Sequence, residues 1–131
     1  MGISRREKRE IIIRILYQID IYEERGILKS VDELILTNTN KNDEFIENTV
    51  KGVIENKEEL DKIANNYIEN WTIDRLDKTG AAILRMALYE IRYTSTPFAV
   101  VIDEAMEMAK KYSDDAVRKI INAVLDKYSK A

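Results

Sequence analysis

The sequence predicts an all-α fold of about seven helices, and three observations support this prediction. Apolar residues recur at intervals of three and four along most of the 131 residues, which is the period of one helix face. Only four Gly and one Pro interrupt the pattern, while Ile, Leu, Lys, Glu and Ala are plentiful. No stretch makes a convincing strand. We therefore expect a helical bundle of two fused subdomains within a single domain, residues 1–131.

The first helix is predicted over residues 5–25. Ser4 and Glu7 have the spacing of a capping box at its start, and Gly26 follows its end. Its apolar face consists of residues at helical period: Ile12, Ile15, Leu16, Ile19 and Tyr22. Behind it, Ser30 and Glu33 repeat the capping box and open a short second helix that is predicted to end at Leu36.

Residues 37–42 are polar throughout and form the clearest predicted loop in the chain. The loop separates an amino-terminal helical group from a carboxy-terminal one. A third helix, over residues 43–55, is expected to bury Phe45 or Ile46 together with Val50 and Val53. Asn56 then breaks the pattern. A fourth helix follows, with its apolar face on Leu60, Ile63, Ala64 and Tyr67.

The remaining helices are less polar. Residues 81–91 are apolar on several sides, which predicts a fifth helix at the centre of the packing. Thr96 and Pro97 are interpreted as the N-cap and the first position of a sixth helix. Ser113 is interpreted as the cap of the seventh, whose apolar stripe is Val117, Ile120, Ile121, Val124, Leu125 and Tyr128. Trp71, between the fourth and fifth helices, is expected in the core or at a joint, because buried indoles outnumber binding ones.

Charge is distributed unevenly along the chain. Residues 1–14 carry five Lys/Arg against two Glu, residues 110–131 carry six against three Asp, and the middle carries ten against nineteen. If folding brings the two ends together, they form one positive face on an acidic body, as expected of a protein that grips a polyanion. Two solvated, charged termini explain the charge pattern equally well.

Composition excludes several kinds of chemistry. The chain contains no Cys and no His, so disulfides, thiolate metal sites and the commonest general base are absent. No phosphate-binding glycine loop and no calcium loop occurs. We expect neither catalysis nor a cofactor or metal. The longest apolar run, residues 98–102, is too short for a membrane span, and the charged start lacks a signal core, so a cytoplasmic protein is expected.

Five sequence blocks occur in a fixed order along the chain: RREKR at 5–9 with ILYQ at 15–18, Trp71 with DRLD at 74–77, ILRMALYE at 83–90, TPFAVVIDEA at 96–105 with AKKY at 109–112, and NAVLDK at 122–127. Together they resemble the NusB family of bacterial transcription antitermination factors over nearly the whole chain. Five positions depart from the family pattern. Asp103 stands for its usual Asn, Ala123 for its Gly, and Ile120 for a frequent Phe. Gly80 and Ala116 stand where relatives often carry charge.

The resemblance implies an all-α RNA-binding protein, monomeric or homodimeric, that pairs with ribosomal protein NusE. The two proteins would hold boxA, a short single-stranded element of ribosomal RNA operons, and would modify the elongating RNA polymerase together with other Nus factors. The acidic middle, including Glu90, is interpreted as a solvated surface or as a face for a basic partner.

The opening cations Arg5, Arg6, Lys8 and Arg9 are the first candidate RNA-binding residues. They occupy the first turns of a helix, where the macrodipole disfavours positive side chains, so an anionic ligand explains them better than helix stability does. A solubilising chain end without a partner is the alternative.

Five residues near the other end complete the candidate site: Lys110, Tyr112, Arg118, Lys119 and Asn122. Cations beside an aromatic ring suit single-stranded RNA, since a base stacks on the ring while its phosphates meet the cations. Tyr112 could instead pack its ring on the core, and Asn122 could cap or bridge the backbone.

Two other functions fit parts of the sequence. The helices at 97–110 and 115–128, joined by a short turn, resemble a helix-turn-helix that binds DNA, although Asp114 and Asp115 are poor residues to press into a groove. The second alternative function is a helical scaffold that dimerises through the apolar residues 81–91 and binds only protein.

Overall fold

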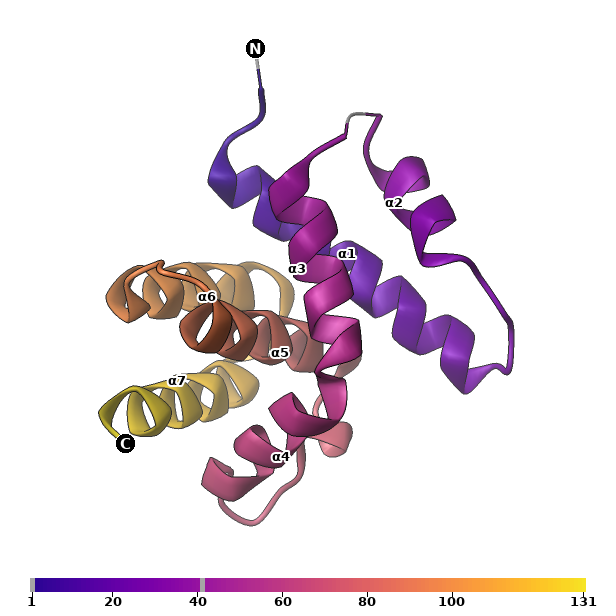
Figure 1. The fold of residues 1–131 in the computed structure, drawn as a ribbon. Coiled ribbons are helices and arrows are strands. Elements are labelled where there is room, and N and C mark those ends of the chain that lie inside the picture. Colours follow the sequence, from indigo (N-terminus) through magenta and orange to yellow (C-terminus); the bar gives the residue numbers. More distant parts are fainter. Residues whose placement is uncertain (1, 41) are drawn as a thin grey trace.

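The computed structural model describes residues 2–40 and 42–131. Within these residues the chain forms seven α-helices, one short 3-10 helix and no strand, which confirms the predicted all-α class (Figure 1). The elements are α1 (Arg5–Glu24), α2 (Val31–Asn38), α3 (Glu44–Glu55), α4 (Lys57–Tyr67), η1 (Ile73–Arg75), α5 (Lys78–Tyr93), α6 (Phe98–Tyr112) and α7 (Asp115–Lys130).

Helix α5 lies at the centre of the packing, as its apolar sequence predicts. It contacts α1, α3, α4, α6 and α7, and every residue from Gly80 to Leu88 is buried. The buried apolar side chains of the described residues form one cluster to which all seven helices contribute. Burial of this apolar surface is the main force that holds the seven helices together.

Contact between α3 and α5 depends on a residue without a side chain. The ring of Tyr89 on α5 occupies the space where a Cβ atom at Gly52 would stand. Any larger residue at position 52 would force the Tyr89 ring to move from this place. The amide of Asn56 donates to the carbonyl of Gly52 at 2.8 Å, and α3 ends there as predicted.

Side-chain caps account for most helix starts. The hydroxyl of Ser4 accepts from the backbone N–H of Glu7, as expected. Two predicted caps are wrong. Pro97 occupies the N-cap position of α6, which was assigned to Thr96. Asp114, and not Ser113, caps α7 by accepting from the N–H of Val117 at 2.8 Å.

Two other expectations change in the connecting segments. Helix α2 continues two residues into the predicted loop, because the side chain of Asn38 donates to the Leu34 carbonyl and to Gln18 of α1. Lys41, within the same predicted loop, lies outside the described residues. Of the two places expected for Trp71, the core and a joint, the structure has the joint: Trp71 lies on the connection between α4 and η1 and is 49% exposed.

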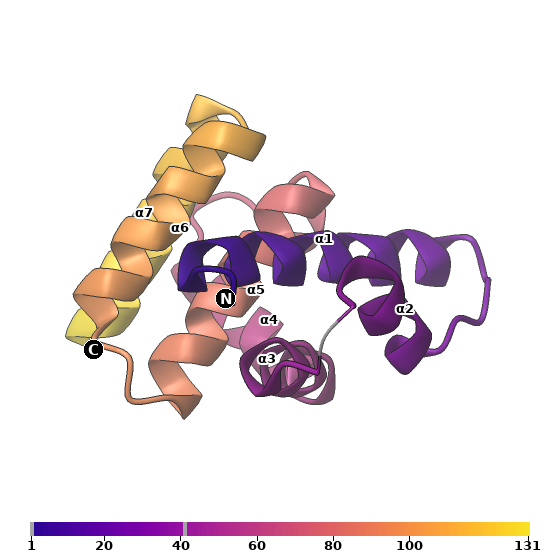
Figure 2. The ribbon, with the colours of Figure 1, turned by 90° about the horizontal axis from the view of Figure 1, so that it is seen from above.

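The first turns of α1, the length of α6 and the start of α7 carry the candidate site, and α6 lies between the other two (Figure 1). The view from above agrees, with α6 covering much of α7 and the amino-terminal end of α1 lying beside α6 (Figure 2). No helix in the described part of the chain is long and apolar enough to cross a membrane.

Candidate nucleic-acid interface

The first turns of α1 present three cations at the surface. Arg5 is exposed and stacks its guanidinium over the ring of Phe45, 3.9 Å from the ring centre. Lys8 forms an ion pair with Asp43 at 2.7 Å. The side chain of Arg6 is more exposed than that of Lys8, and it reaches α6. The helix dipole repels all three, so their energetic support comes from these contacts or from an external anion.

Arg6 and Glu104 join α1 to α6 through a two-point contact. The Nε and Nη2 atoms of Arg6 donate to the two carboxylate oxygens of Glu104, each at 3.0 Å. This hydrogen bonding lowers the pKa of Glu104 below its ordinary value, against an opposing effect of burial. The carboxylate therefore stays charged and holds the guanidinium over α6.

Arg9 differs from its neighbours because it faces the core. Its Nε and Nη2 atoms donate to the Glu90 carboxylate at 2.9 and 2.8 Å, and the two residues are only 4% and 1% exposed. The expectation that Arg9 belongs to an exposed RNA-binding cluster is therefore corrected, and so is the expectation that Glu90 lies on the solvated surface. The pair satisfies two charges that would otherwise be stranded in the interior.

The carboxy-terminal end of α6 lies beside α1. Glu10 on α1 accepts from the Lys111 ammonium and from the Tyr112 hydroxyl, both at 2.9 Å. The hydrogen bond from Lys111 is the main cause that lowers the pKa of Glu10, and the Tyr112 hydroxyl adds to it. Lys110 is exposed and has no carboxylate within 4.0 Å among the described residues. The contacts of Glu10 and Glu104 thus bring two predicted clusters, separated by about a hundred positions, onto one face.

A hollow of about 190 Å³ opens between α1, α5 and α6 on this face. Its walls include the two half-exposed tyrosines Tyr17 and Tyr112, with Arg14 and Glu10 beside them. From the sequence, Tyr17 with Arg14 could extend the RNA path, although a half-buried tyrosine is the preferred interpretation. Only the fold shows that residues 17 and 112 line the same hollow.

The predicted α7 residues lie on the other flank of α6. Arg118 lines a second hollow of about 230 Å³ together with Lys110. Lys119 and Asn122 are exposed on the next turns, opposite the buried Ile121. Arg118 and Lys119 both pair with Asp115. This part of the predicted cluster therefore meets the α1 cations only through α6.

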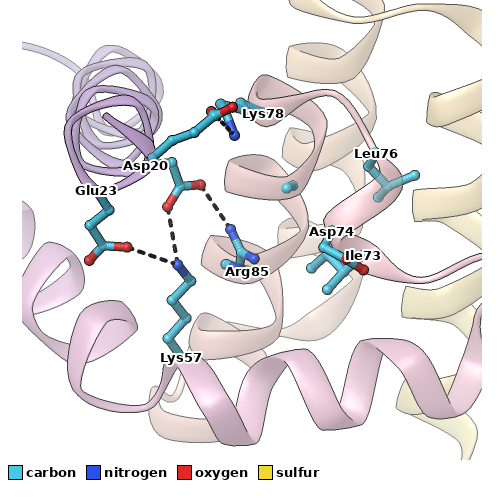
Figure 3. A pocket seen from close by; sticks show the side chains of 10 residues that line it. Asp20, Glu23, Lys57, Ile73, Asp74, Leu76, Lys78 and Arg85 are labelled. Carbon is cyan, nitrogen blue, oxygen red and sulfur yellow. Dashed lines mark hydrogen bonds and ion pairs between the residues drawn. The ribbon is translucent and has the colours of Figure 1, made fainter. Parts of the chain in front are cut away.

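The opposite end of α1 borders a larger hollow, of about 350 Å³, in which cations and carboxylates alternate (Figure 3). Arg85 is buried there and donates to Asp20 and Asp61, while Lys57 pairs with Asp20 and Glu23. The network ties α1 to α4 and α5. Because its cations are paired and its rim is acidic, the hollow is a poor site for a polyanion.

Comparison with known proteins identifies the family. Residues 6–130 match the NusB family. The transcription antitermination protein NusB of Thermoanaerobacter sp. (strain X514) is 39% identical, over 93% of this chain and 87% of its own length. The corresponding protein of Listeria innocua serovar 6a is 40% identical over 93% of both chains.

Solved structures agree with the sequence matches. NusB of T. maritima superposes with a TM-score of 0.85 at 26% identity, covering 99% of this chain and 93% of that one. The solved complex of antitermination factors NusB and NusE with double-stranded RNA superposes with a TM-score of 0.78 at 25% identity, covering 96% of each chain. Because sequence and fold match from end to end, this chain belongs to the NusB family.

Proposed function

We propose that this chain is a cytoplasmic, non-enzymatic RNA-binding protein that acts in transcription antitermination. One observation carries the proposal: Arg6 of α1 and the Lys111–Tyr112 end of α6 lie along one helix contact, which Glu104 and Glu10 join, although the chain as a whole has a formal net charge of −3. Clustered cations on an acidic body direct a polyanion to a single place. Arg5, Arg6, Lys8, Lys110 and Tyr112 form this proposed RNA face, and Arg118, Lys119 and Asn122 extend it across α6.

Tyr112 supplies the feature that distinguishes a strand with unpaired bases from other polyanions. Its ring is 43% exposed and borders the hollow that Tyr17 also lines. An unpaired base stacking there, with its phosphates on the adjacent cations, is the usual way in which single-stranded RNA is held. The proposed ligand is therefore a single strand of the boxA type from ribosomal RNA operons.

The proposed protein partner is ribosomal protein NusE. Support comes from the relatives, since a NusB of the same fold has been solved with NusE and RNA. In this proposal the two proteins present the RNA to the elongating RNA polymerase and its other Nus factors. The acidic middle of the chain is suited to a basic ribosomal protein, because complementary charge speeds association and disfavours wrong partners.

Fluorescence anisotropy with a labelled, uridine-rich boxA oligomer tests the RNA face. We expect binding that weakens as salt rises and that tightens when NusE is added. Arg6→Ala should weaken binding and lower the salt slope by about 1. Tyr112→Leu should weaken binding by removing the stacking ring, whereas Tyr112→Phe should retain it. Lys51→Ala is the control, because Lys51 lies on α3 and pairs with Asp32 and Glu47 away from this face.

Absent or salt-independent binding with and without NusE would refute the proposal. Duplex RNA is a necessary second ligand, because the solved NusB–NusE complex holds double-stranded RNA. Duplex DNA is the third: tighter binding to DNA at matched salt would favour a helix-turn-helix function of α6 and α7. Against that function, Asp115 in the first turn of α7 already pairs with Arg118 and Lys119.

A further inference from the structure

Two carboxylates form ion pairs with cations of the proposed RNA face. Glu104 of α6 binds Arg6 of α1, and Glu10 of α1 binds Lys111 and Tyr112 of α6. The two contacts run in opposite directions between the same two helices. Each helix therefore supplies both a cation for the face and an acid that neutralises a cation of the other.

The geometry of both contacts resembles that of a bound phosphate. Glu104 offers two oxygens to two N–H groups of one guanidinium, each at 3.0 Å, which is the planar arrangement that Arg also makes with phosphate. A single oxygen of Glu10 collects an ammonium and a phenol hydroxyl, both at 2.9 Å. Phosphate oxygens would accept from the same donors.

Burial shows which partner of each pair is free to move. The side chains of Glu104 and Glu10 are 18% and 19% exposed, whereas those of Arg6 and Lys111 are 58% and 60% exposed. The acids are thus held against the protein while the cations reach into solvent. An approaching phosphate therefore reaches the cations from solvent and competes with the carboxylates for the same N–H and O–H donors.

We infer that Glu10 and Glu104 are specificity-determining residues that compete with RNA phosphate for the cations of this face. The inference depends on the proposed function, since it concerns the same RNA face. An incoming strand must exchange with both carboxylates, so isolated phosphates and random polyanions gain little. A strand that also stacks on Tyr112 and contacts Lys110, which has no carboxylate within 4.0 Å among the described residues, supplies the additional binding energy.

Charge-neutral variants test the competition. We expect Glu104→Gln and Glu10→Gln each to tighten binding of the single-stranded boxA oligomer about twofold to fivefold at moderate salt, the range that an exposed ion pair allows. The double variant should combine the two effects, because the acids neutralise different cations. Binding of a random-sequence RNA should tighten more than that, so that the ratio of the two affinities falls. An unchanged ratio would show that the two acids do not determine specificity.

Glu107→Gln is the matched control. Glu107 lies on the same helix, and it raises the pKa of Arg6 through space, whereas Glu104 raises it mainly through a hydrogen bond. Removing the Glu107 charge tests the general electrostatic effect of one fewer acid, because the hydrogen bonds between Arg6 and Glu104 remain. Equal tightening by Glu107→Gln and Glu104→Gln would overturn the inference. Weaker binding by Glu104→Gln, with an unchanged helical circular dichroism spectrum, would also overturn it, because Glu104 would then position Arg6 for RNA.

The experiments distinguish failure of the proposed function from failure of this inference alone. If the unaltered chain binds no RNA under any condition, the proposed function falls, and the inference with it. If the unaltered chain binds RNA and Arg6→Ala weakens that binding, while neither glutamate variant tightens it, only the inference falls. Because Glu10 and Glu104 lie at different ends of the α1–α6 contact, a folding defect in one variant leaves the other as the test.

Discussion

Arg6 and Arg9 are the same residue type on the same helix, one turn apart, and the fold gives them opposite surroundings. Arg6 pairs with a partly covered carboxylate at the surface, whereas Arg9 and Glu90 neutralise each other in the interior. A buried pair contributes little net stability when intact, yet removing one partner leaves an uncompensated charge in the core. The two arginines should therefore respond very differently to truncation.

Arg9→Ala should lower the free energy of unfolding by about 3–5 kcal/mol, because it strands the Glu90 carboxylate among apolar side chains. Replacing both residues, as in Arg9→Met with Glu90→Leu, should recover most of that loss. Urea denaturation followed by circular dichroism measures both. Arg6→Ala is the control and should change stability far less, since its pair is solvated. Equal losses for Arg6→Ala and Arg9→Ala would contradict the buried assignment.

Sequence alone predicts that the opening cations form a cluster, but it does not distinguish the one that turns inward. The difference comes from a partner 81 positions away, Glu90, which reads as one more acid in an acidic segment. The same limit applies to Tyr17 and Tyr112, whose shared hollow depends on how α1 crosses α6. Residue type indicates the chemistry of the site, whereas the fold decides which members reach it.

At the level of the helices, the periodicity of apolar residues predicts all seven helices and their order. It predicts the residues at which they begin and end less well. Ser113 and Asp114 are adjacent and both are good capping residues, so sequence does not separate them. In the structure the Asp114 carboxylate accepts from the backbone N–H of Val117. The Ser113 hydroxyl instead donates to the Asp77 carboxylate. That carboxylate caps α5 by accepting from the N–H of Gly80. The extension of α2 to Asn38 likewise depends on a tertiary contact, with Gln18.

Asp114→Ala should destabilise the protein by about 1 kcal/mol, because it removes the side-chain oxygen that accepts from the backbone N–H of Val117 at the start of α7. Ser113→Ala should cost less, since its hydroxyl bonds an exposed carboxylate rather than an orphaned backbone N–H. Thermal unfolding of the two variants side by side gives the comparison. The reverse order would restore Ser113 as the cap.

For the molecule as a whole, the charge pattern of the sequence is realised as a network of ion pairs that join distant segments. Glu10 and Glu104 connect α1 to α6, and Asp20 connects α1 to α4 and α5. Individually such surface pairs contribute little. Together they make the stability of the fold dependent on the ionisation of its carboxylates.

Stability should be nearly constant around neutral pH and should fall in acid. The chain has no His, so no side chain with an ordinary pKa between about 5 and 8 titrates there. Hydrogen bonds from Arg6 and Lys111 lower the folded-state pKa values of Glu104 and Glu10 from the ordinary 4.5. As pH falls through that value, the unfolded chain takes up protons first, so stability declines until the folded carboxylates are also protonated.

Urea midpoints measured from about pH 7 down to about pH 3 test this dependence. In the variant Glu10→Gln with Glu104→Gln, the midpoint should depend less steeply on pH below 4.5, the ordinary pKa of both groups. An identical acid profile for the variant and the unaltered chain would show that these two carboxylates do not contribute to the decline.

The exposed position of Trp71 has a practical consequence for all such measurements. The chain contains one tryptophan, and its indole is 49% accessible to water on the α4–η1 connection. We therefore expect its emission in the native protein to be close to that of a hydrated indole and to shift little on global unfolding. Quenching of that fluorophore reports instead on whatever docks against the connection, which makes Trp71 a native optical probe of that surface.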